Sequence, residues 1–341
     1  MGSRFGERAS LHALPYSGST QACLSPDVAA GCDEELCALS ANLFRIERLA
    51  VHDGPGIRTV LFFKGCPLRC KWCSTPESQT ALPETLYKVE QCTACGSCVN
   101  ACPKGALSLS PVGSVHTDHS LCTGLGFCVE ACPYGARKWV GDTITLDQVM
   151  SEIEKDEIFY HRSGGGITLS GGEPLLQPAF AEAVLAAARM RGISTALETC
   201  GHFSWDICQG VGRHLDLVYV DIKHADPARH EALTGVRNEI ILENIQRMAA
   251  LWTETDLVVR IPVVPGLNDD PKNLQETAEV IQALDRVSRV ELLPYHRYGV
   301  ATYERLGREY SLKDLKPPSS ELLQAVALVF SSRGLSVRIG G

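Results

Sequence analysis

Hydrophobic and polar residues follow two different patterns along the chain from about Arg58 onward. Short runs rich in β-branched residues predict strands, and longer segments with apolar residues every three to four positions predict helices. The predicted strands cover residues 57–63, 166–170, 193–198, 216–222, 257–263, 288–293 and 335–339. The predicted helices cover residues 147–159, 178–191, 204–211, 238–252, 271–285 and 319–332. Strands that alternate with helices indicate an α/β fold with a parallel sheet.

The number of strand–helix units predicts a partial barrel. Six units are two short of a full (β/α)8 barrel, so we expect a partial (β/α)6 barrel over residues 42–84 and 141–341. A cysteine-rich segment, residues 85–140, is inserted after the first strand and its loop. Residues 1–41 are rich in Gly, Ser and Ala with weak periodicity, and we expect them to form a poorly ordered tail.

Composition and charge argue against several classes of function. The chain has 341 residues, 45% of them hydrophobic, and its net charge of −8 argues against a nucleic-acid partner. No apolar stretch approaches the ~20 residues that a membrane helix needs, and the start lacks the pattern of an export signal. We therefore expect a cytoplasmic monomer without a membrane partner. Fifteen cysteines at metal-like spacings favour reduced thiols over disulfides.

The most informative motif follows the first predicted strand. Cys66, Cys70 and Cys73 form a C-x3-C-x2-C triplet in the run KGCPLRCKWCSTPE. Iron–sulfur clusters are normally held by four cysteines, so a triplet leaves one iron of a cubane cluster open to another ligand. A structural zinc site is the alternative, but it needs four ligands around one ion, and the triplet has no fourth ligand nearby.

The insert carries two further cysteine runs that follow the bacterial ferredoxin pattern, C-x2-C-x2-C-x3-C-P. In such modules the fourth cysteine of each run binds the cluster of the other run. The first cluster would therefore be held by Cys92, Cys95, Cys98 and Cys132. The second would be held by Cys102, Cys122 and Cys128. These spacings predict a ferredoxin-like domain with two cluster sites.

The second run departs from the pattern at Leu125, which stands where the middle cysteine belongs. Leucine cannot bind iron, so the second cluster is a three-iron species, a four-iron cluster with an outside ligand, or absent. His116, Asp118 and His119 lie just upstream and are candidates for that ligand. The alternative is that they are ordinary polar loop residues.

Other candidate site residues lie at or near the carboxyl ends of the predicted strands, where reactive groups of parallel barrels gather. They are Gly171, Gly172, Glu173, Glu198, Thr199, Asp221, Ile222, Lys223, His224, Arg260 and His296. A glycine pair before a carboxylate lets the backbone approach a ligand closely. Alone, each of these residues would more often be part of a turn, a strand end or the core, but together they predict one site.

The triplet and its flanks resemble the radical S-adenosylmethionine (SAM) enzymes, and in particular the glycyl-radical-enzyme activases. The resemblance runs from about Arg45 to the C-terminus. Besides the triplet it is carried by TPES, DGPGIRT, DIKHADPARHEALTGVRNEIILENI and RIPVVPGLNDD. It implies that the open iron binds the amino and carboxylate groups of SAM. It also implies that one electron then breaks the S–C5′ bond and yields a 5′-deoxyadenosyl radical.

The resemblance assigns roles to the residues around the triplet. Glu173 would contact the SAM amino group, and Lys223 would pair with the SAM carboxylate. Glu198, Thr199 and Asp221 match positions that hold a monovalent cation near that carboxylate in relatives. Relatives often carry Asp at the first of these positions, where this chain has the longer Glu.

Further roles concern the nucleoside part of SAM and the partner protein. His296 would contact the ribose, and Trp72 would stack near the adenine, with Ser74 also counted among the SAM-binding positions. Arg260 is either a second SAM contact or a salt-bridged residue of the barrel. Asp53 fills a position near the bound glycyl loop of the partner.

Two cysteines remain outside these motifs, Cys200 and Cys208, and both are interpreted as small buried hydrophobic residues. The resulting hypothesis is an activase whose radical abstracts hydrogen from a backbone glycine of a partner glycyl radical enzyme. An external flavodoxin or ferredoxin would deliver the electron through the insert. Two alternatives stay open: a radical SAM enzyme acting on a small molecule, and a ferredoxin-type electron carrier. Activases with two-cluster inserts serve lyases and dehydratases of several substrate classes, and these residues select none of them.

Overall fold

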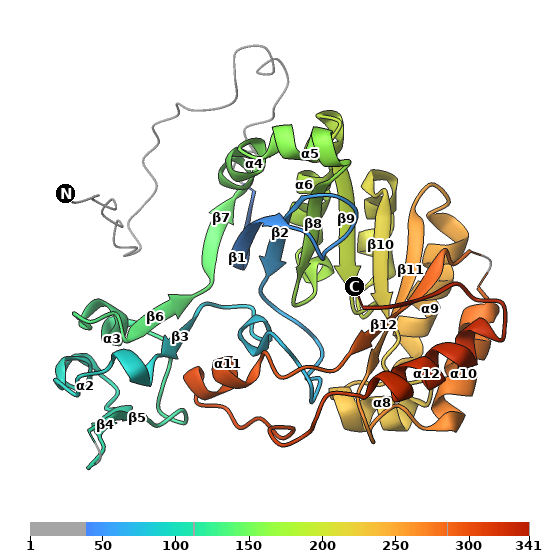
Figure 1. Cartoon of the computed structure of the whole chain (residues 1–341). Helices are drawn as coiled ribbons and strands as arrows, with labels where there is room; N and C mark the ends of the chain where they lie inside the picture. The colour runs from blue at the N-terminus through green and yellow to red at the C-terminus, as the bar shows by residue number, and fades with distance from the viewer. Residues whose placement is uncertain (1–38, 112, 285, 341) are drawn as a thin grey trace.

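The computed structural model describes residues 39–111, 113–284 and 286–340. The predicted tail, residues 1–41, lies almost wholly outside the described residues, although the first strand includes Ser40 and Ala41 from that segment. Figure 1 shows a curved sheet with helices along it and a smaller lobe to one side.

A nine-stranded sheet forms the larger part of the described chain, in the order β13-β12-β11-β10-β9-β8-β2-β1-β7. Its parallel strands are β2 (Arg58–Phe63), β8 (Gly166–Gly171), β9 (Ser194–Thr199), β10 (Leu217–Asp221), β11 (Asp256–Val263), β12 (Arg289–Pro294) and β13 (Val337–Ile339). The antiparallel strands β1 (Ser40–Ala50) and β7 (Asp142–Thr145) extend one edge. An open sheet of parallel strands separated by helices confirms the predicted partial α/β barrel.

Helices connect the parallel strands. They are α4 (Leu146–Glu154), α5 (Glu157–Ser163), α6 (Pro178–Met190), α7 (Trp205–Cys208), α8 (Pro227–Thr234), α9 (Glu239–Leu251), α10 (Pro271–Gln282), α11 (Val300–Arg305) and α12 (Ser320–Ser331). Short 3-10 turns are η1 (Pro76–Ser78), η2 (Val89–Gln91), η3 (Pro174–Leu176) and η4 (Gln209–His214). Helices α6, α8 and α10 begin with proline, whose missing N–H is not needed in a first turn. Asp226 and Asp270 cap α8 and α10 through their side chains.

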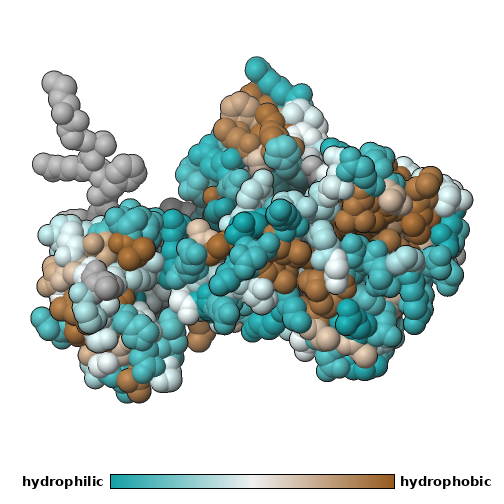
Figure 2. All heavy atoms as spheres, turned by 60° about the horizontal axis from the view of Figure 1, so that its bottom comes forward, coloured by the Kyte–Doolittle hydropathy of each residue, from teal (hydrophilic) through white to brown (hydrophobic). Residues whose placement is uncertain are grey.

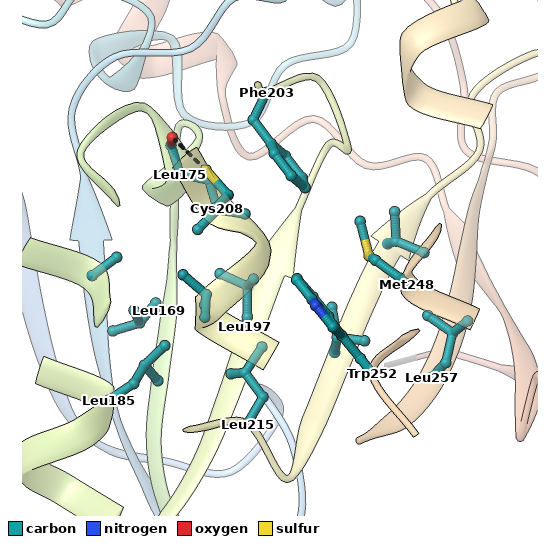
Figure 3. Close-up of a cluster of buried hydrophobic side chains, with 14 of the residues drawn as sticks. Leu169, Leu175, Leu185, Leu197, Phe203, Cys208, Leu215, Met248, Trp252 and Leu257 are labelled. Carbon is teal, nitrogen blue, oxygen red and sulfur yellow. Dashed lines mark hydrogen bonds between the residues drawn. The ribbon is translucent and has the colours of Figure 1, made fainter. Parts of the chain in front are cut away.

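Apolar side chains of the sheet and its covering helices form the main core. Figure 3 shows a part of it, where Leu169 of β8 and Leu197 of β9 lie with Leu185 of α6 and with Trp252, which follows α9. Cys208 is fully buried in the same core, and its thiol donates to the Leu175 carbonyl oxygen at 3.6 Å. The interpretation of Cys208 as a buried hydrophobic residue agrees with this position.

Two strands and two helices of the barrel part were not predicted from the sequence. β1 carries irregularities between Leu43 and Arg45 and between Glu47 and Ala50, which break the alternation that marks a strand. β7 has only 4 residues, α8 has 8 and α11 has 6. Segments this short carry too few turns or alternations for a periodic pattern to emerge.

The predicted helix over residues 147–159 is in fact two helices, α4 and α5, that meet at Asp156. The Asp156 carboxylate is fully buried and accepts hydrogen bonds from Arg48 Nε at 2.8 Å and from Thr59 Oγ1 at 3.1 Å. The hydrogen bond from Arg48 lowers the pKa of Asp156, against the effect of burial. These long-range contacts end α4 early. The predicted helix over 204–211 is likewise the short α7 followed by η4.

The cysteine-rich insert forms two small antiparallel sheets and two short helices. Its elements are β3 (Glu84–Tyr87), α2 (Ser97–Ala101), β4 (Leu107–Leu109), β5 (Val115–Thr117), α3 (Phe127–Glu130) and β6 (Arg137–Val140). Figure 2 shows it as a lobe at the left of the molecule. Arg305 of α11 pairs with Glu90 at 3.0 Å, and Arg308 pairs with Glu84, so polar contacts fasten the lobe to the barrel.

Candidate active site

The loop that carries Cys66, Cys70 and Cys73 leaves the carboxyl end of β2 and lies directly against the loop after β8. Gly172 N donates to Phe63 O at 2.9 Å, and Glu173 N donates to Gly65 O at 2.7 Å. A Cβ on Gly171 would come within 2.5 Å of Phe63 N, and one on Gly172 within 2.1 Å of Gly65 O. Both glycines are therefore required because the two loops approach each other so closely.

The other side of the same loop is fastened to the end of α8. Arg69 N donates to Thr234 O at 2.6 Å, and Lys71 N donates to Leu233 O at 3.0 Å. The Arg69 guanidinium also donates to Cys66 O at 2.6 Å. Gly65 N also donates to Ser78 O of η1 at 2.7 Å, so backbone bonds to η1, to the segment after β8 and to α8 fix the loop that presents the thiols.

The three thiols lie close enough together to influence one another. The pKa of Cys70 is raised to about 12, chiefly by burial, while Lys223 lowers it and the thiols of Cys73 and Cys66 contribute to the rise. Burial also raises the pKa of Cys73. The Cys66 thiol takes a hydrogen bond from Cys200, which lowers its pKa. Three partly buried cysteines from one loop are a donor set that fits a cubane iron–sulfur cluster with one open iron.

The arrangement differs from a site for a single metal ion. Among the described residues, no three His, Cys, Asp or Glu side chains converge as one metal ion requires. Each cysteine of a four-iron cluster binds its own iron, so the cysteines of a cluster need not converge on one point.

Lys223 brings a positive charge to the thiols. Its Nζ donates to Asp221 Oδ2 at 2.5 Å, and only 8% of its side chain is exposed. Burial lowers the pKa of Lys223, but Asp221 and the thiols of Cys70 and Cys200 outweigh burial, and the net shift is upward. The ammonium group is therefore charged and lies between a carboxylate and the thiols.

Glu173 is fully buried beside Cys66 and is held by three donors. Its Oε2 accepts from Thr199 Oγ1 and from Cys200 N, both at 2.8 Å, and its Oε1 accepts from Leu175 N at 3.1 Å. Burial raises the pKa of Glu173, and these hydrogen bonds oppose the shift. The carboxylate is thus kept in one orientation by the ends of β9 and η3.

A second charged group lies within the curve of the sheet. Arg260 Nη1 donates to Glu198 Oε1 at 2.5 Å, Arg260 Nε donates to Glu291 Oε2 at 3.2 Å, and the guanidinium lies 3.6 Å from the centre of the Tyr219 ring. Ser170 Oγ also donates to Glu198 at 2.6 Å. Of the two interpretations of Arg260, these contacts favour the salt-bridged residue of the barrel.

Asp53, in the loop between β1 and β2, lies near Glu198 and Arg260. The pKa of Asp53 is raised to about 6, chiefly by burial, with Glu198 adding to the rise and Arg260 opposing it. Because the folded pKa lies above the unfolded value of about 3.9, stability contributed by this group falls as pH rises through roughly 4 to 6. We expect Asp53→Asn to be more stable than the natural chain at pH 8 by about 1 kcal/mol, after allowance for solvent screening. The stability gap should shrink at pH 5.

Thermal unfolding of both proteins at pH 5 and pH 8 measures this gap. Glu254→Gln, which changes an exposed carboxylate in the turn after α9, serves as the control and should show no comparable change between the two pH values. A gap for Asp53→Asn that is the same at both pH values would contradict the expectation.

The remaining predicted residues lie in other segments around the carboxyl ends of the parallel strands. Trp72 packs beside the buried tyrosine cluster that includes Tyr295 and Tyr303. His296 stacks on Tyr298 with ring centres 4.2 Å apart, and burial lowers the pKa of His296. Ser74 is exposed.

The side chains of the segment Asp221–His224 point to different surroundings. Ile222 is buried and its N–H donates to Arg260 O at 2.9 Å. His224 accepts from Asp226 N at 3.0 Å, and its other ring nitrogen lies 4.0 Å from Asp270 Oδ2. It lines a hollow between the starts of α8 and α10 rather than the group of thiols.

One residue beside the thiols was not among the predicted site residues. Cys200 is buried, as expected of a small hydrophobic residue, and in addition its thiol contacts Cys66 and its N–H donates to Glu173. The available signal was its place directly after Glu198 and Thr199 at the end of a parallel strand. A single cysteine without a spaced partner carried no motif, so its neighbours became visible only in three dimensions.

The insert gathers its cysteines around two hollows. One is lined by Cys92, Cys95, Cys98 and Cys132. The other is lined by Cys102, Cys122 and Cys128, with Leu125 in its wall. In each hollow the fourth cysteine of one run therefore lies with cysteines of the other run. His116, Asp118 and His119 do not line the second hollow, and Asp118 instead accepts hydrogen bonds from Ser120.

Comparison with known proteins shows which class of enzyme the chain resembles. Residues 124–278 match the model of the radical SAM superfamily, and residues 91–136 match the model of the 4Fe-4S dicluster domain. A relative from Bilophila wadsworthia, the (2S)-3-sulfopropanediol sulfolyase activating enzyme, is 46% identical over 80% of this chain and 91% of its own. In Oleidesulfovibrio alaskensis the choline trimethylamine-lyase activating enzyme is 43% identical over 80% and 89% of the two chains. The isethionate sulfite-lyase activating enzyme of that organism is 45% identical over 78% and 87%.

The chain belongs to the radical SAM family of glycyl radical enzyme activating enzymes. It is an oxidoreductase whose family cleaves SAM reductively and generates a glycyl radical on another enzyme, which confirms the function predicted from the motifs. The alternative of an electron carrier without catalysis is not supported. Among the described helices, none is both long enough and apolar enough to cross a membrane.

Proposed function

We propose that the Cys66–Cys73 loop, Glu173 and the Asp221–Lys223 pair form one site that holds a [4Fe–4S] cluster and SAM. The observation that carries the proposal is that Lys223 Nζ and the Glu173 carboxylate both lie beside the cysteine triplet, one bringing a positive and the other a negative charge. The methionine part of SAM has the opposite pair, a carboxylate and an ammonium group. A cluster bound by the three thiols would leave one iron for these groups and supply the electron for cleavage.

The residues of the chain would then bind and orient SAM. Lys223, positioned by Asp221, pairs with the SAM carboxylate, and Glu173 uses its free lone pairs to accept from the amino group. His296 and Trp72 are proposed to contact the ribose and the adenine. Burial of these groups excludes water, which would otherwise weaken the charge contacts.

Three predicted positions take supporting roles in this proposal. Arg260 orders Glu198 and so shapes the wall of the site. Because Arg260 already neutralises Glu198, we leave a monovalent cation out of the proposal. Ile222 and His224 position Lys223 through the packing of their segment rather than through contact with SAM.

We also propose that residues 85–140, which are inserted in the chain between residues 42–84 and 141–341 of the barrel, act as an electron-transfer domain. The hollow lined by Cys92, Cys95, Cys98 and Cys132 suits a four-iron cluster, and the second hollow offers three cysteines. A flavodoxin or ferredoxin would deliver electrons to this domain. The protein is proposed to act in the cytoplasm as a monomer.

The substrate is proposed to be a backbone glycine of a glycyl radical enzyme. Relatives named as activating enzymes of lyases and dehydratases support this class of partner. Asp53 lies at the inner wall of the barrel, near Glu198 and Arg260, where an entering loop of the partner would meet a carboxyl group.

An anaerobic experiment tests the function. The protein, reconstituted with iron and sulfide, is mixed with SAM, a strong reductant and a glycyl radical enzyme encoded by a neighbouring gene. We expect a persistent organic radical doublet in the electron paramagnetic resonance spectrum and an equivalent amount of 5′-deoxyadenosine. Formation of 5′-deoxyadenosine without a doublet on any such partner would favour the small-molecule alternative.

A further inference from the structure

Arg137, the first residue of β6, lies between the two cysteine-lined hollows of the insert. It belongs to the lining of both, and only 3% of the residue is exposed. No other residue appears in both linings among those that the structure describes. A side chain that is always charged is thus buried at the boundary between the two proposed cluster sites.

The polar atoms of this side chain are incompletely paired within the chain. Arg137 Nε and Nη2 are buried and have no hydrogen-bond partner among the described residues. The guanidinium lies 4.3 Å from the centre of the Tyr87 ring, which supports it from one side. Buried N–H donors and buried charges are normally paired, so two unpaired donors on one guanidinium indicate an acceptor that the polypeptide alone does not supply.

The surroundings indicate the chemistry of that acceptor. The charge of Arg137 acts on the thiol of Cys98 in one hollow and on the thiol of Cys128 in the other. Cysteine thiolates and inorganic sulfides of iron–sulfur clusters are anionic acceptors, and hydrogen bonds to sulfur are one of the known controls of cluster potential. Tyr87, which supports the guanidinium, lies on β3 beside Arg137 in the ladder of β3 and β6.

We propose that Arg137 directs its charge and the N–H groups of its two unpaired nitrogens, Nε and Nη2, to the sulfur atoms of iron–sulfur groups in both hollows and raises their reduction potentials. The inference rests on the proposed function of the insert as a two-cluster domain. A positive charge and donated hydrogen bonds favour the reduced form, which is the more negative one. Arg137 is therefore a positioning and tuning residue shared by the two sites, rather than a ligand.

Redox titration of the reconstituted full-length protein, followed by electron paramagnetic resonance, tests this role. In Arg137→Gln we expect the reduction equilibrium of the insert signals to shift about tenfold toward the oxidised form, which is about 59 mV for one electron. Arg137→Lys keeps the charge but not the planar fork, and its shift should be smaller. Lys138→Gln removes the same charge from the next residue, which is exposed, and should leave the potentials unchanged.

Two further measurements separate this inference from the proposed function: the iron and sulfide content of each variant, and the electron paramagnetic resonance signal that changes when SAM is added. Insert potentials that are unchanged in Arg137→Gln, with full iron content, would overturn the role of Arg137. An equal shift in Lys138→Gln would also overturn it. If Arg137→Gln loses iron, Arg137→Lys is titrated in its place, and a potential identical to that of the natural chain counts against the role. A natural chain without insert signals would contradict the two-cluster domain itself, and the inference with it.

Discussion

Cys66→Ala is expected to lower reductive cleavage of SAM by at least about 1000-fold, which corresponds to about 4 kcal/mol or more in the barrier. The thiol of Cys66 is one of three that the loop after β2 presents, and alanine offers no ligand in its place. The loop itself should keep its shape, because backbone bonds to η1, to the segment after β8 and to α8 hold it. Formation of 5′-deoxyadenosine in a single anaerobic turnover with excess reductant measures the loss.

Two further variants make this test specific. Cys208→Ala removes a fully buried thiol from the main core and should leave cleavage within about twofold of the natural chain, because this cysteine only packs and donates to Leu175. Cys200 contacts Cys66 and could replace it as a ligand, so Cys66→Ala/Cys200→Ala closes that route. Retained cleavage in the double variant would refute the assignment of Cys66 to the cluster.

The sequence pattern predicted the parallel strands of the barrel because each is a short run of residues that suits a strand buried on both faces. Val60, Leu61 and Phe63 in β2, for example, are all fully buried, and such runs stand out from the helices between them. β1 was missed for the opposite reason. It lies in the antiparallel part of the sheet, between β2 and β7, where bulges and solvent exposure mix polar and apolar residues without a regular period.

The positions of the candidate residues in the fold followed from the same pattern, since a residue that ends one parallel strand must lie beside the residues that end the next. Their contacts did not follow. The reason for Gly171 and Gly172 lies in the backbone of a loop more than a hundred positions earlier in the chain, and the partner of Cys66 is Cys200. Contacts of this kind depend on side-chain direction at the strand ends, which periodicity does not encode.

The roles of Arg260 and Arg137 could not be predicted from the sequence either, for two different reasons. Arg260 looked equally suited to bind SAM or to pair inside the barrel, and only the distances to Glu198 and Glu291 distinguish the two. Arg137 carried no motif at all, because its significance comes from lying between two hollows formed by distant cysteines. Cysteine spacing predicts where iron can bind, whereas the charges that tune it are visible only in the folded chain.

Lys223→Met is expected to weaken SAM binding by about 100-fold, or about 2.7 kcal/mol, with little change in the iron content. Methionine fills a similar volume but cannot pair with the SAM carboxylate. It also leaves the Asp221 carboxylate without the ammonium group at 2.5 Å, so that two carboxylates would face each other when SAM binds. Equilibrium binding of SAM to the reconstituted protein measures the change, and Lys71→Met, on the exposed side of the same loop, is the matched control.

The double variant Asp221→Asn/Lys223→Met decides between two physical accounts of this loss. If Lys223 only neutralises Asp221, removing both charges relieves the repulsion and should restore nearly all of the affinity. If Lys223 pairs with the SAM carboxylate, the double variant still lacks a cation for that group, and we expect it to recover no more than about tenfold of the 100-fold loss. Full recovery would assign Lys223 to the support of Asp221 and remove it from the SAM-binding residues.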